Sequence, residues 1–94
     1  MTLVGKKELT AFSLRYPSIR GALAAWSAEV ESSQWLSPQE IKDRFGSASF
    51  IGKDRVVFNI KGNRFRVDVQ VNYAAQVVLV RRIGTHAEYN SWTF

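Results

Sequence analysis

A histidine and a tyrosine three residues apart are the side chains best suited to chemistry in this sequence. His86 is the only histidine of the chain, and Tyr89 follows it within residues 84–89, GTHAEY. Thr85 can cap a single helical turn, which would place both side chains on one side of that turn. Histidine moves protons near neutral pH, and tyrosine offers a phenolic hydroxyl. The spacing therefore suits acid–base catalysis, although each residue taken singly is more often a surface or packing residue.

Three cations could stabilise a phosphate beside this pair. Lys61, Arg64 and Arg66 surround a predicted turn between strands, and such side chains neutralise the extra charge of a phosphorane-like transition state. In metal-free RNA cleavage a base draws the proton from a ribose 2′-hydroxyl, which attacks the adjacent phosphate, and an acid protonates the leaving 5′ oxygen. The candidate catalytic residues are therefore His86, Tyr89, Lys61, Arg64 and Arg66. The residues alone establish less, namely a basic domain that binds RNA or DNA.

A β-hairpin must position these cations. Residues 55–71 alternate between apolar and polar side chains and are interrupted by Gly62-Asn63. This dipeptide predicts a type II′ turn, in which glycine accepts the first positive φ at low cost. Asn59 then faces Arg66, and one face of the hairpin is apolar while the other is basic. The basic face carries Arg55, Asn59, Lys61, Arg64 and Arg66.

A third strand is predicted over residues 77–83, after a tight turn near Ala74. In the register that pairs valine with valine on the apolar side, Arg81 opposes Asp68 on the basic face. Arg82 then falls toward the core-side margin near the end of the strand.

Four aliphatic residues share the basic face in this register: Val57, Val77, Leu79 and Ile83. A bare solvent surface rarely gathers so many apolar side chains. We expect the C-terminal segment with Trp92 and Phe94 to cover part of them, and a partner protein to cover the rest.

Helical periodicity fills the first half of the chain. Residues 6–16 predict one helix, Pro17 opens a second whose apolar stripe reaches Val30, and residues 38–45 predict a short third one. Helices followed by a meander of strands indicate an α+β fold, with the N-terminal helices packed on one face of a small antiparallel sheet. No repeat or linker interrupts the sequence, which predicts a single domain over residues 1–94.

Charge and composition narrow the class of protein. The net charge is +5, and residues 53–82 hold seven lysines and arginines against two aspartates. This excess predicts a polyanionic partner such as nucleic acid, while a charged face kept for solubility explains it equally well. The absence of cysteine and the single histidine argue against a disulfide framework or a zinc site, so no metal and no cofactor are expected. Without a membrane-length apolar run or a signal-peptide pattern, we expect a cytoplasmic protein with no membrane partner.

Two segments together resemble the HigB family of bacterial toxins within the RelE/ParE-like superfamily. They are residues 56–67, VVFNIKGNRFRV, and residues 84–90, GTHAEYN; the Tyr16-Pro17 junction and residues 24–26 are also similar. The resemblance covers nearly the whole chain and implies a RelE-like toxin domain. It further implies an mRNA interferase that cuts ribosome-bound message and so inhibits translation. A cognate helix-turn-helix antitoxin is implied as well, with DNA contacted only through the repressor complex.

The resemblance also implies roles for individual residues. His86 and Tyr89 would transfer protons, without an assignment of which is acid and which is base, and Asn90 stands where the family usually has aspartate. If that carboxylate orients His86 or Tyr89, the asparagine lowers activity, whereas a capping role would tolerate it. Phosphate stabilisation falls to Lys61, Arg64 and Arg66. RNA binding is expected of Arg55, Asn59, Arg81 and Arg82. Antitoxin contact is expected of Val57, Val77, Leu79 and Ile83.

Two alternative functions are compatible with the same sequence. A non-enzymatic, ParE-like toxin would use the basic face to inhibit DNA gyrase and would leave message intact. A non-catalytic RNA-binding module would instead stack bases on exposed aromatic rings interleaved with arginine. The second alternative is less favoured, because Phe58 and Phe65 fall on the core side of the predicted hairpin.

Overall fold

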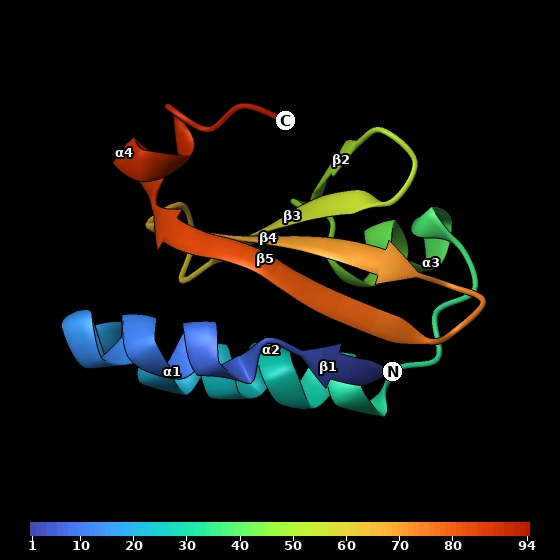
Figure 1. Ribbon diagram of the computed structural model, residues 1–94, viewed down its shortest axis with the longest axis horizontal. Helices are drawn as coiled ribbons and strands as arrows, with labels where there is room; N and C mark the ends of the chain where they lie inside the picture. The colour runs from blue at the N-terminus through green and yellow to red at the C-terminus, as the bar shows by residue number, and fades with distance from the viewer.

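Helices and strands form two layers in the computed structural model, which describes residues 1–94 (Figure 1). The strands are β1 (Thr2–Val4), β2 (Ser49–Ile51), β3 (Arg55–Ile60), β4 (Phe65–Asn72) and β5 (Val77–Thr85). The helices are α1 (Lys6–Arg15), α2 (Arg20–Ser32), α3 (Pro38–Arg44) and α4 (His86–Tyr89), with a 3₁₀ turn at Pro17–Ile19. No helix is both long enough and apolar enough to cross a membrane. This order of elements confirms the predicted α+β class.

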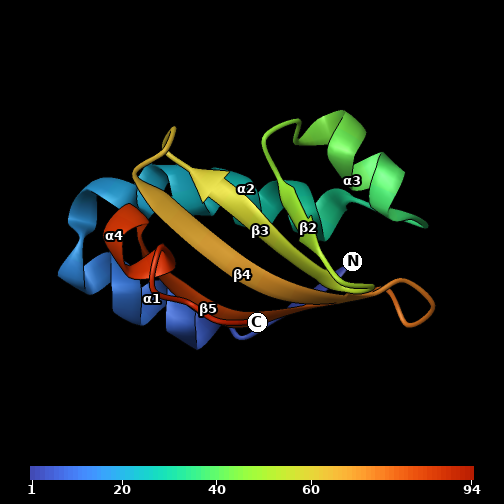
Figure 2. The same ribbon diagram turned by 90° about the horizontal axis from the view of Figure 1, so that it is seen from above.

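The five strands form one sheet in the order β1-β5-β4-β3-β2. All neighbouring pairs are antiparallel except β1, which runs parallel to β5. Figures 1 and 2 show α1 and α2 on one face of this sheet, here called the inner face. They also show α4 and the C-terminal segment on the opposite, outer face. The outer face carries Arg55, Val57, Asn59, Arg66, Asp68, Gln70, Val77, Leu79 and Arg82.

The inner face forms the core together with α1 and α2. Its buried residues are Val56, Phe58, Ile60, Phe65, Val67, Val69, Val71, Val78 and Val80. Phe58 is 1% exposed and contacts Trp26, Trp35 and Phe45, with ring centroids 5.3, 6.3 and 5.1 Å away. Burial of one such ring contributes on the order of 2–3 kcal/mol. The predicted core-side placement of Phe58 and Phe65 is confirmed, and the hairpin is anchored to the helical layer.

The β3–β4 hairpin has the predicted register, with Asn59 opposite Arg66. Across the two predicted turn residues, Gly62 and Asn63, the Arg64 backbone N–H donates to the Lys61 carbonyl oxygen (3.4 Å). Gly62 has the predicted positive φ, of 68°, at the low cost that glycine allows. Lys61 also has a positive φ, of 56°, which is costly for lysine and was not predicted.

A β-bulge on β5 changes the predicted register of its second half. Val69 pairs with Val80 as expected, but the pairing shifts by one residue beyond it, so that Arg82 opposes Asp68. The predicted pairing of Arg81 with Asp68 is therefore wrong, as is the core-side placement of Arg82. An extra residue in one strand reverses which side chains reach each face. Ile83 accordingly packs against the core instead of joining the basic face.

Candidate functional site

A single helical turn at the end of β5 carries both proton-transfer candidates. The Glu88 backbone N–H donates to the Thr85 hydroxyl (3.2 Å), and the Thr85 backbone N–H donates to the Glu88 carboxylate (2.9 Å), which completes a capping box. The predicted cap by Thr85 is confirmed. The His86 backbone N–H also donates to the carbonyl oxygen of Arg64 (2.9 Å). This hydrogen bond attaches the helical turn α4 to the β3–β4 hairpin at Arg64.

Arg66 joins two of the other candidate residues. Although charged, it is only 7% exposed, and its Nη1 donates to the carbonyl oxygens of Asn63 (2.9 Å) and Phe65 (3.2 Å). Its Nη2 lies 3.1 Å from His86 Nδ1, and its guanidinium carbon lies 5.1 Å from the Tyr89 ring centroid. Because a guanidinium has donors only, His86 Nδ1 accepts this hydrogen bond. The ring is therefore neutral, with its proton on Nε2, while the bond is made.

The remaining candidate cations lie in different surroundings. Arg64 is exposed at the hairpin turn, and its guanidinium makes no hydrogen bond or ion pair within the protein. Lys61 Nζ donates instead to the Ser18 carbonyl oxygen (2.9 Å), in the 3₁₀ turn before α2. Asn59 faces Arg66 across the hairpin, and its side chain approaches that of Asn63 at 3.4 Å. The structure therefore groups Arg66, His86 and Tyr89 beside Arg64, and ties Lys61 to the helical layer.

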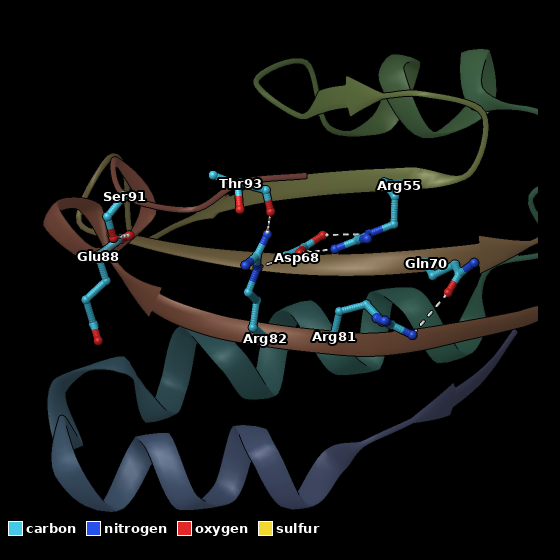
Figure 3. A network of polar contacts seen from close by, with 8 residues as sticks. All are labelled: Arg55, Asp68, Gln70, Arg81, Arg82, Glu88, Ser91 and Thr93. Atoms are coloured by element: carbon cyan, nitrogen blue, oxygen red, sulfur yellow. Dashed lines mark hydrogen bonds and ion pairs between the residues drawn. The ribbon is translucent and has the colours of Figure 1, made fainter.

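The two other outer-face arginines flank a buried carboxylate (Figure 3). Asp68 is fully buried, and its oxygens accept from Arg55 Nε at 3.2 Å, from Arg55 Nη2, and from Arg82 Nε at 2.9 Å. Both guanidinium groups are thereby held in place, and the cluster keeps a net charge of +1. Arg81 is exposed, with Nη1 3.4 Å from Gln70 Oε1. Of the cations expected to bind RNA on β3 and β5, Arg81 is the one without an ionic partner.

Aromatic rings of the C-terminal segment lie on these arginines. The guanidinium carbon of Arg82 is 4.6 Å from the Trp92 ring centroid and 4.8 Å from that of Phe94, and Arg55 lies 5.4 Å from Phe94. Trp92 also meets Tyr89 edge-on, at 5.6 Å between centroids. Trp92 and Phe94 were expected to cover aliphatic residues of the basic face, and the contacts that they make are instead with Arg82 and Arg55. Their stacking on arginine was not predicted, although the aromatic spacing after a basic strand was a usable signal.

Two backbone features hold this segment against the sheet. Arg82 Nη2 donates to the carbonyl oxygen of Thr93 (2.9 Å). Gly84 lies directly under Trp92, since a Cβ there would come within 2.8 Å of Trp92 Cζ2. Any larger residue at position 84 would displace the indole. The glycine of the GTHAEY segment therefore lets the rings approach the strand.

A model of the HigB toxins, the RelE-like toxic component of a toxin–antitoxin system, matches residues 19–92. The chain belongs to the HigB toxin family. It is 30% identical to the mRNA interferase toxin HigB of Escherichia coli K12, over 99% of this chain and 91% of that protein. The mRNA interferase HigB of Shigella flexneri is similar to the same extent. That of Escherichia coli O6:H1 is 24% identical, with 92% of it covered. A RelE-like fold accordingly agrees with the helices on one face of the sheet.

Asn90, the residue at which a departure from the family pattern was expected, lies at the end of α4. Its backbone N–H donates to the carbonyl oxygen of His86 (3.2 Å), and its side chain makes no hydrogen bond within the protein. The side chain that contacts the imidazole is Arg66. The side chain that positions the His86 ring in this structure thus comes from the hairpin and not from position 90.

Two of the four aliphatic residues expected to contact an antitoxin line a groove at the other end of the outer face. Val77 and Leu79 are half-buried there, beside Asp54 and Tyr73, around a volume of about 600 Å³. Val57 is instead buried opposite Asp68. A toxin–antitoxin family implies an antitoxin partner for this chain. Val77 and Leu79 are accessible to one on the outer face, while Ile83, which is also half-buried, lines a separate hollow beside α1.

Tyr73 gives a stability prediction in this groove. Its hydroxyl is buried without a hydrogen-bond partner. Burial, followed by the charge of Asp54, raises the pKa of Tyr73 above its ordinary value. The unfolded chain therefore loses this proton at lower pH than the folded protein, and stability falls as pH rises above about 10. Tyr73→Phe should raise the free energy of unfolding by about 1 kcal/mol at neutral pH and reduce the alkaline loss, measured by urea unfolding.

Tyr89→Phe is the matched control, because the Tyr89 hydroxyl is neither buried nor hydrogen-bonded within the protein. It should change the free energy of unfolding by less than about 0.5 kcal/mol. A loss of stability in Tyr73→Phe would show that its hydroxyl has a hydrogen-bond partner in solution.

Proposed function

We propose that this protein is a metal-independent mRNA endonuclease, an mRNA interferase that cuts ribosome-bound message and inhibits translation. The observation that supports this most directly is the position of Arg66, which contacts both His86 Nδ1 and the Tyr89 ring. Two proton-transfer groups and one cation thus lie together, and we expect the Arg64 guanidinium to reach the same phosphate because the Arg64 backbone is bonded to His86. The relatives named mRNA interferases point to the same activity.

In the proposed reaction the 2′ oxygen of a ribose attacks the adjacent phosphorus, and the bond from phosphorus to the 5′ oxygen breaks. The products are a 2′,3′-cyclic phosphate and a free 5′-hydroxyl. One proton leaves the 2′-hydroxyl and another reaches the 5′ oxygen, and His86 and Tyr89 supply these two transfers. Arg66 and Arg64 stabilise the charge that grows on the non-bridging oxygens. Lys61 Nζ is hydrogen-bonded to the Ser18 carbonyl oxygen, so we assign Lys61 to contact with RNA or the ribosome. It would stabilise the cleaved phosphate only after breaking this hydrogen bond.

The contact between Arg66 and His86 adds an order of events to this mechanism. A neutral imidazole that accepts at Nδ1 would have to become an imidazolate to give up its Nε2 proton. His86 therefore transfers protons only after Arg66 releases Nδ1. A substrate phosphate is a stronger acceptor for the guanidinium than an imidazole nitrogen. Phosphate binding would then draw Arg66 from His86, and Nδ1 could take up a proton.

The test is expression of the protein in bacteria, followed by primer extension on total RNA. Discrete new 5′ ends that depend on translation are expected for the natural protein. His86→Ala and Tyr89→Phe should each reduce cleavage about 10²-fold and relieve growth arrest. Lys7→Ala, an exposed cation on the opposite layer, should remain toxic.

Other outcomes separate the alternatives. Full toxicity of both folded variants would reject the assignment of His86 and Tyr89. Intact message with altered plasmid supercoiling would reject cleavage in favour of a gyrase inhibitor.

We further propose a helix-turn-helix protein as the antitoxin, with DNA contacted only in that complex, and a cytoplasmic site of action.

A further inference from the structure

Cationic and aromatic side chains form a continuous row across the outer face, here called the arginine–aromatic ladder. Successive members are 5.1, 5.6, 4.6, 4.8 and 5.4 Å apart, measured between ring centroids or from guanidinium carbon to ring centroid. In spatial order the ladder consists of Arg66, Tyr89, Trp92, Arg82, Phe94 and Arg55. It begins at the candidate catalytic residues and ends on β3. The outer face thus presents aromatic rings and planar guanidinium groups in a row.

The far end of the ladder is open to solvent. Phe94 is 52% exposed, although one ring lies against two guanidinium groups. The other large exposed apolar residues, Val4, Leu14 and Leu36, are aliphatic and take no part in the ladder. The free energy of exposing an aromatic ring to water is unfavourable. The exposed side of the Phe94 ring can therefore stack on another planar group without any rearrangement of the core.

Two arginines of the ladder are held with their planar faces against the rings. Asp68 holds Arg55 and Arg82 by ion pairs beneath Phe94, and Arg82 also donates to the Thr93 carbonyl oxygen. Both Nε–H groups and one Nη2–H of each arginine are thus occupied. Of the exposed cations, Arg64 lies at the hairpin turn, whereas Arg81 lines the same hollow as Arg55, Arg82 and Phe94.

We propose that the arginine–aromatic ladder is a stacking site for unpaired bases of single-stranded RNA. This inference rests on the proposed function, since it extends the RNA path from the cleaved phosphate toward Arg55. Every base has a π face, so stacking on aromatic rings and guanidinium planes binds a strand with little regard to sequence. Arg64 and Arg81 would contact phosphates of the same strand.

The ladder predicts a specific dependence on salt. Phosphate contacts release counterions, so each lost contact lowers the slope of log affinity against log salt by about 0.7 for a single strand. Stacking releases no such ions. Phe94→Ala should weaken binding roughly 5- to 100-fold and leave the slope unchanged, whereas Arg81→Gln should reduce the slope.

Binding is measured by fluorescence anisotropy on a short labelled RNA strand whose 2′-hydroxyls are methylated, which prevents cleavage. Phe94→Tyr should bind like the natural protein, because the ring is retained. Leu36→Ala removes a side chain that is 73% exposed outside the ladder and should have no effect. Circular dichroism and urea unfolding confirm that each variant is folded.

Two results would overturn the proposal. Unchanged or tighter binding by Phe94→Ala would mean that the C-terminal rings only cover the face and compete with RNA. A loss of salt slope in Phe94→Ala equal to that in Arg81→Gln would mean that the ring acts through phosphate contacts. The methylated strand is not cut, so this assay measures binding alone and does not depend on proton transfer by His86 or Tyr89. Failure of the ladder therefore leaves the cleavage assignment open to its own test.

Discussion

Arg66→Ala should lower the rate of mRNA cleavage about 10³-fold. This guanidinium is expected to stabilise the phosphate in the transition state, and before the substrate binds it positions the His86 ring and lies against the Tyr89 ring. Alanine removes the transition-state charge together with this positioning, which is why the expected loss exceeds that of either proton-transfer residue alone. Cleavage rates on translated message, followed by primer extension over time, measure the effect.

Variants that keep part of the function separate charge from orientation. Arg66→Lys retains the charge but loses the planar fork that reaches His86 and two carbonyl oxygens, so it should recover only part of the rate. Lys7→Ala, which removes an exposed cation of α1 on the opposite layer, should keep the natural rate. Nitrogen-15 NMR should show the His86 proton on Nε2 in the natural protein. A natural rate in folded Arg66→Ala would reject Arg66 as the phosphate-stabilising residue.

The meander of β3, β4 and β5 and the register of its hairpin followed from the sequence because their causes are local, whereas β1 and β2 were not predicted. Alternating side chains assign each residue to a face, and the turn fixes the pairing, as Asn59 and Arg66 show. The bulge on β5 has no such local cause. The bulge satisfies two contacts with residues distant in the sequence. Arg82 reaches the buried Asp68, and Ile83 packs against the core. Neither contact can be predicted before the strands are placed in the sheet.

The candidate site was predictable to a similar degree. The Thr85 cap follows from residues three apart, and the structure also brings Arg66 beside His86 through the hairpin register. The contact of Lys61 with Ser18 joins residues 43 positions apart and depends on how the 3₁₀ turn packs. An aspartate within an otherwise apolar and basic strand was the missed signal for the cluster at Asp68.

Asp68→Ala should lower the free energy of unfolding by about 2–3 kcal/mol, measured from urea unfolding. Removing one partner of a buried ion pair typically costs about 3–5 kcal/mol because the opposite charge stays behind unpaired. Here two guanidinium groups would face each other across an empty position. Their side chains are 24% and 32% exposed, so water can compensate for part of the loss, which places the expected value below that range.

A double-mutant cycle with Arg55→Met distinguishes the ion cluster from simple loss of packing. If the charges matter, Asp68→Ala should cost less in the Arg55→Met background, because only Arg82 is then left unpaired. Equal costs in both backgrounds would show that Arg55 contributes nothing to the stability through its charge, since Arg82 still pairs with Asp68 in both.

Asp68→Ala also bears on RNA binding. Freed from Asp68, Arg55 and Arg82 could turn toward phosphates, so Asp68→Ala should steepen the salt dependence of RNA binding while Asp68→Glu keeps it unchanged. One buried carboxylate would thus decide whether these arginines support rings or bind phosphates.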